Sequence, residues 1–132
     1  MFLIGTGGGE FVGPNVQRLG GLAAKKIVPH LDSWDVLINP SRAENAPLVI
    51  GEAASRGCCA FVADEGGMAS MVSDLGGGSS YNSEARLTAL LEAQAHVPHS
   101  VRHQQGVALA ARARELYSVP SVVDAYLEVY QK

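Results

Sequence analysis

Several features that mark common classes of protein are scarce or missing in this chain. Only two cysteines occur, Cys58 and Cys59, and because they are adjacent they suit a reducing compartment better than a disulfide framework. No apolar run approaches the roughly 20 residues of a membrane span, and the apolar start at 1–5 is too short for a signal peptide. Charged residues make up 17% of the chain and the formal net charge is −3, which argues against a broad nucleic-acid surface. We therefore expect a cytoplasmic protein without a transmembrane segment, and peripheral membrane contact stays open.

Signatures of hydrolytic and metal chemistry are also missing. The sequence has no G-x-S-x-G elbow, no Walker loop and no cysteine with a matched histidine, so nothing supports a nucleophilic hydrolase. His99 and His103 stand four residues apart on an expected helix, a spacing that zinc accepts, but no third ligand is nearby. We expect no metal site.

The pattern of apolar segments predicts an α/β fold. At 132 residues, 47% of them hydrophobic, the chain is long enough for one domain with a core of its own. The expected strands are short apolar runs at 2–4, 36–38 and 58–63, a short strand at 16–19, and at most a brief last strand at 79–81. Helices are expected at 23–34, in two pieces because of Pro29, after Pro47, at 68–73, and in three segments from Asn82 onward. This predicts a Rossmann-like core at 1–81, with a parallel sheet flanked by helices, and C-terminal helices of the same domain at 82–132.

The stretch 39–52 carries the strongest functional signal. Asn39 and Pro40 are expected to end the strand before them, and Asn45 to cap a helix that has Pro47 in its first turn. The free N–H groups at such a helix start can hold an anion such as a phosphate. The carboxylates of Glu44 and Glu52 repel phosphate but can accept hydrogen bonds from sugar hydroxyls. The alternative is that both are surface carboxylates stabilised by the helix dipole, at roughly 0.3–1 kcal/mol.

At these residues the chain resembles a known family. Glu44 and Glu52, with seven residues between them and a small-residue helix after them, resemble the E-x7-E signature of retaining nucleotide-sugar glycosyltransferases of the family-4 type. Five other segments resemble motifs of that family in the same order. Residues 1–9 resemble its strand and "VGDGP" turn, 13–20 its "NVxFLG" strand and 31–41 its "ADVFVLPS" strand. Residues 52–64 resemble its "EAMACGTPVVASD" helix and strand, and 66–68 its "GG" turn.

The resemblance implies a fold and a part of an enzyme. Members of the family have the two-domain GT-B fold, and this chain resembles the C-terminal, donor-binding half without its first βα unit. That unit carries an Arg and a Lys that grip the donor diphosphate. The resemblance thus implies that the chain acts with an N-terminal half, which binds the acceptor, and that the isolated fragment is inactive.

The resemblance also implies roles for individual residues. Glu44 would touch the donor sugar on its reacting face as the catalytic residue, Glu52 would bind the ribose diol, and no cofactor or metal is implied. The remaining donor-binding candidates are Asn45, Ala46, Leu48 and Val49 in the central loop and helix, and Gly5, Thr6, Arg18 and Leu19 near the N-terminus. The glycine cluster at 5–9 does not fit a dinucleotide fingerprint, because Glu10 stands where glycine is needed; a plain turn is the alternative there.

Two departures from the family pattern bear on donor binding. Pro47 removes one N–H donor from the loop, and Ala69 and Ser70 stand where the family has Pro-Glu after its glycines. Two other classes therefore stay open beside the transferase: a nucleotide-sugar 2-epimerase of the same fold, and a non-catalytic interaction module. The C-terminal helices carry Tyr126 and Tyr130, which are expected to lie on an exposed apolar patch through which the chain could dimerise.

Overall fold

The computed structural model describes residues 1–4 and 13–131. The chain divides into two compact units, Met1–His30 and Leu31–Lys132. The first unit contains a parallel pair of strands, β1 (Phe2–Ile4) and β2 (Gln17–Gly20), in which Phe2 is paired with Gln17 and Leu3 with Arg18. Helix α1 (Ala24–Leu31) follows and ends at the first residue of the second unit. Both strands agree with the predicted ones to within a residue.

The second unit is built on a three-stranded parallel sheet. Its strands β3 (Val36–Asn39), β4 (Cys59–Ala63) and β5 (Gly78–Tyr81) lie side by side in that order. Val36 is level with Cys59, and Ala60 with Gly78. Helix α2 (Leu48–Ala54) connects β3 to β4, and α3 (Met68–Leu75) connects β4 to β5. These are two consecutive βαβ units, so the predicted α/β fold with a parallel sheet is confirmed.

Three helices complete the described part of the second unit: α4 (Glu84–His96), α5 (His99–Tyr117) and α6 (Val119–Tyr130). Ser83 caps α4 by accepting a hydrogen bond from the Arg86 N–H at 3.2 Å, and Ser118 caps α6 through the Ser121 N–H at 3.3 Å. The three helical segments expected from Asn82 onward are therefore confirmed.

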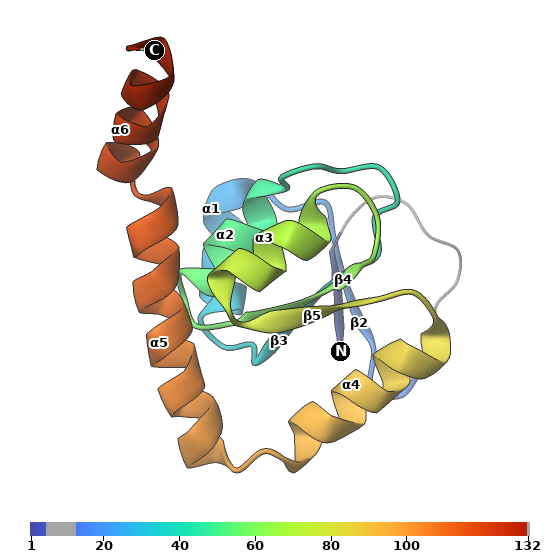
Figure 1. Ribbon diagram of the computed structural model, residues 1–132. Helices are drawn as coiled ribbons and strands as arrows, with labels where there is room; N and C mark the ends of the chain where they lie inside the picture. Colours follow the sequence, from blue (N-terminus) through green and yellow to red (C-terminus); the bar gives the residue numbers. More distant parts are fainter. Residues whose placement is uncertain (5–12, 132) are drawn as a thin grey trace. The chain divides into compact units, whose positions relative to one another are not determined.

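The core lies on one face of the sheet. Figure 1 shows α2 and α3 on the same side of β3–β5, with α5 running past them. The main cluster of buried side chains comes from β4 and these three helices, namely Ile50, Ala54, Ala60, Val62, Met68, Val72, Leu75, Leu109 and Ala113. Helices α4 and α6 contain no fully buried residue, and Tyr126 and Tyr130 on α6 are exposed as expected.

Two of the sequence expectations at prolines are wrong. Pro29 does not divide α1, because it is the sixth of eight residues and removes a single N–H donor close to the end of the helix. Pro47 is the N-cap of α2 rather than a first-turn residue, with an extended backbone at φ −67° and ψ 125°. Asn45 does not cap the helix: α2 has no side-chain cap, and its first turn is closed by the Ile50 N–H and the Pro47 carbonyl at 3.1 Å.

Candidate functional site

The loop 40–47 begins where β3 ends, and the loop 64–67 begins where β4 ends. Because the strands are parallel neighbours, both loops leave the same edge of the sheet. This is the carboxyl edge, where open α/β sheets bind their ligands. The Glu44 to Glu52 stretch therefore lies at the edge that suits a ligand site.

The carboxylate of Glu44 is held from the end of β3. Asn39, the last residue of that strand, donates its Nδ2 hydrogen to Glu44 Oε2 at 3.1 Å. The Asn39 Oδ1 atom accepts from the Ser41 N–H at 3.0 Å, so the amide is fixed at both ends. Asn39, which was expected to end the strand, is the last residue of β3 and contacts the predicted catalytic residue Glu44.

The glycine pair at 66–67 packs directly on the Glu44 loop. A Cβ atom at Gly66 would collide with the main-chain carbonyl oxygen of Glu44, and one at Gly67 with that of Asn45. Gly66 also has a φ of +59°, a conformation that glycine adopts at little cost. The two loops at the carboxyl edge are thus in backbone contact, and glycine makes that contact possible.

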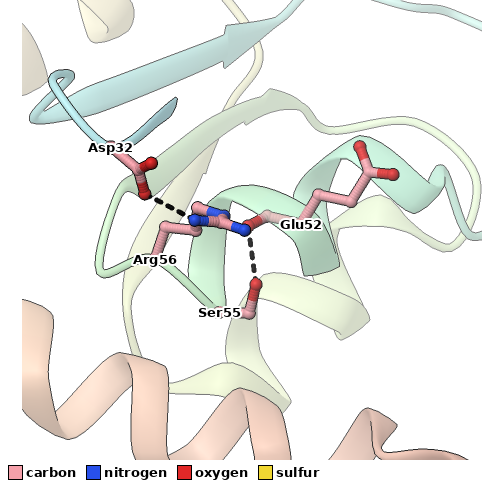
Figure 2. A network of polar contacts seen from close by, with 4 residues as sticks. All are labelled: Asp32, Glu52, Ser55 and Arg56. Atoms are coloured by element: carbon pink, nitrogen blue, oxygen red, sulfur yellow. Dashed lines mark hydrogen bonds and ion pairs between the residues drawn. The ribbon is translucent and has the colours of Figure 1, made fainter. Parts of the chain in front are cut away.

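Glu52 lies on α2 with an exposed side chain. Its carboxylate has no hydrogen-bond or ion-pair partner among the described residues, and only its main-chain carbonyl is engaged, by Ser55 Oγ at 2.8 Å. The nearby Arg56 instead pairs with Asp32 at 2.6 Å. Figure 2 shows the Glu52 carboxylate extending away from that pair. Glu52 is therefore an open acceptor that no cation in this network neutralises.

The other loop candidates differ in what they offer. The N–H groups of Leu48 and Val49 precede the first hydrogen bond of α2 and can donate to a ligand, while Pro47 has no N–H. The Leu48 side chain is 81% exposed, whereas Val49 packs against the core. Asn45 and Ala46 are exposed in the loop. Since α2 has only seven residues, these individual donors matter more than its dipole.

The N-terminal candidates belong to other parts of the chain. Arg18 is exposed and Leu19 half-buried on β2, in the separate unit Met1–His30. Gly5 and Thr6 lie outside the described residues. The site that can be built from contacts therefore consists of the two loops and α2.

A cavity of about 1050 Å³ lies at the other end of the same strands, at their amino edge between α4 and α5. Trp34, Phe61 and Leu109 form part of its apolar lining, and the Arg56–Asp32 pair and Arg102 are among its charged residues. None of the residues from 36 to 54 lines it. No local pattern in the sequence indicates this cavity, because its lining comes from segments as far apart in the chain as Asp32 and Arg114.

Metal and thiol chemistry find no support in the described part of the chain. No group of three His, Cys, Asp or Glu side chains there could hold a metal ion, although His99 and His103 both line the amino-edge cavity. Burial raises the pKa of the Cys58 thiol to about 12 and that of Cys59 to about 11. The nearby Asp35 adds to both increases, so neither thiol is an activated nucleophile at neutral pH.

Comparison of the chain with protein-family models, with curated proteins and with solved structures finds no match. No helix within 1–4 and 13–131 is long and apolar enough to cross a membrane. The functional assignment therefore depends on the residues of the site and on the sequence motifs.

Proposed function

We propose that this chain is the donor-binding domain of a retaining glycosyltransferase with the GT-B fold. Its ligand is a nucleotide-diphospho-sugar, bound at the Glu44 loop and the start of α2. The observation that supports this most is the position of the E-x7-E stretch in the fold. Glu44 and Glu52 flank the turn from β3 into α2 at the carboxyl edge of a parallel sheet.

The groups available there match the parts of such a donor. Glu44 has one carboxylate oxygen engaged by Asn39, and its other oxygen can accept a hydrogen bond from a sugar hydroxyl. The main-chain N–H groups of Ala46, Leu48 and Val49 can donate to the distal phosphate. Glu52, with both carboxylate oxygens open, suits the two hydroxyls of a ribose.

In the proposed reaction these contacts hold the leaving nucleoside diphosphate and orient the anomeric carbon toward the acceptor. Negative charge that develops on the leaving phosphate is met by the N–H donors at the start of α2. A second domain binds the acceptor, so the chain alone binds the donor without transferring sugar. Sugar transfer with retained anomeric configuration requires both domains.

Calorimetric titration with nucleoside diphosphates and nucleotide-sugars of each base tests this function. We expect saturable binding of one base type. Glu52→Ala should weaken that binding by about 1–3 kcal/mol, because the ribose hydroxyls lose an acceptor. Glu128→Ala on α6 is the matched control, since it removes the same charge from an exposed helix outside the proposed site. Equal affinity in the wild type and Glu52→Ala would refute the assigned role, and no binding of any nucleotide would refute the function.

A further inference from the structure

We infer that Asn39 is a positioning residue, which holds the Glu44 carboxylate in the orientation that meets the donor sugar. The inference rests on the proposed function. It adds a residue that selects for the sugar part of the donor rather than for its nucleotide.

The orientation of the Asn39 amide follows from its partners. The Ser41 main-chain N–H can only donate, so the atom that it meets at 3.0 Å must be the amide oxygen. This leaves the NH2 group for Glu44 Oε2 at 3.1 Å, and an ionised carboxylate can only accept. Both contacts fit one amide orientation, so Asn39 cannot flip without losing both bonds.

Asn39 is also better fixed than the residue that it holds. It is half-buried at the end of β3, next to β4, where it is level with Val62. Glu44 is exposed in a loop without regular secondary structure, and a free glutamate side chain samples many rotamers. The hydrogen bond to Asn39 therefore restricts the Glu44 carboxylate to one position relative to the sheet.

The bond leaves Glu44 half engaged. Among the described residues, Asn39 is the only side chain that bonds this carboxylate, and Oε1 has no partner. With Oε2 held by Asn39, the open Oε1 atom of Glu44 can accept a hydrogen bond from one hydroxyl of the ligand. If the Glu44 carboxylate were ordered only when the donor binds, the entropy lost in ordering it would weaken the binding of the sugar.

The variant Asn39→Asp separates this role from a structural one. The aspartate keeps an oxygen for the Ser41 N–H, so the turn after β3 is preserved, but it replaces the donor to Glu44 with a second carboxylate. We expect the affinity for the nucleotide-sugar to fall about tenfold, which corresponds to about 1.4 kcal/mol, while the affinity for the matching nucleoside diphosphate stays unchanged. If Asn39→Asp does not fold, Asn39→Ser also keeps an acceptor for Ser41 and takes its place.

A double-mutant cycle with Glu44→Ala completes the test. If Asn39 acts through Glu44, its substitution has no further effect on nucleotide-sugar affinity once Glu44 is alanine. Equal weakening of both ligands, an unchanged nucleotide-sugar affinity, or a full additional loss in the Glu44→Ala background would each overturn the inference. A wild-type chain that binds neither ligand would overturn the proposed function, and this inference with it. A wild type that binds both ligands beside an unaffected variant would overturn the inference alone.

Discussion

Gly67→Ala is a sharp test of how the two loops of the site support each other. The backbone at Gly67 has φ −88° and ψ −1°, which any residue can adopt, so alanine brings no conformational strain of its own. A Cβ atom there would collide with the Asn45 carbonyl oxygen and lie 3.1 Å from its carbon and 3.3 Å from the Asn45 Cα. All three are backbone atoms, so the loop that carries Glu44 has to move.

The size of the effect follows from two opposing contributions. Replacing glycine by alanine in a compatible conformation stabilises by about 0.4–1 kcal/mol through the unfolded chain. Overpacking against a fixed neighbour costs about 1–3 kcal/mol. We therefore expect the free energy of unfolding, measured in urea, to fall by about 1–2 kcal/mol. The affinity for the nucleotide-sugar should fall as well, because Asn45 and Glu44 are displaced.

Gly51→Ala is the matched control. A Cβ atom at Gly51 would lie 3.6 Å from Met71 Cε and 3.7 Å from Tyr117 Cδ2, which is ordinary van der Waals contact. Gly51 is inside α2, so alanine should stabilise the protein by about 0.5–1 kcal/mol. A Gly67→Ala protein as stable as Gly51→Ala would refute the contact between the two loops.

Two further predictions concern the packing of the second unit. Burial raises the pKa of Cys58 to about 12 and of Cys59 to about 11, so the unfolded chain loses these protons first as pH rises above 9.0. The free energy of unfolding should therefore decrease between pH 8 and pH 10, as measured by urea titration. The decrease should be smaller in the double variant Cys58→Ala/Cys59→Ala, and an equal decrease would contradict the role of the thiols. Gly57 has φ +80° and its Cβ would lie 2.9 Å from the Gly106 carbonyl oxygen, whereas Gly76 has φ +67° and open space. Gly57→Ala should therefore cost about 1–3 kcal/mol more than Gly76→Ala, and equal losses would contradict this close approach of α5.

The strands and most helix ends could be predicted because their signals are local. β3 and β4 are short apolar runs between polar or glycine residues, and Ser83 and Ser118 each cap the helix that follows them directly. The start of α2 could not, because Pro47 remains extended and leaves Asn45 too far from the helix to cap it. The residue types at 45–47 do not by themselves decide whether Pro47 stands in the first turn of the helix or before it.

The supporting contacts of the site depend on tertiary structure. Asn39 reaches Glu44 only because the loop turns back over the end of β3, and Gly67 meets Asn45 only because β3 and β4 are neighbours. No spacing along the chain indicates either contact. The two glutamates could be predicted as candidates, since their spacing and the polar turn between them are visible in the sequence. Their roles stay predictions, as do those of Arg18, Leu19, Gly5 and Thr6.

Amide chemical shifts recorded during a titration with nucleotide-sugars would test the proposed donor site most directly. The largest changes should occur at Ala46, Leu48 and Val49, whose N–H groups are expected to meet the distal phosphate. The cavity at the amino edge provides the contrast, because Arg102 and Leu109 line it at the opposite end of the strands. Saturable changes confined to the start of α2 are the predicted result. Changes centred on Arg102 and Leu109, or none at any residue, would contradict a donor site at the Glu44 loop.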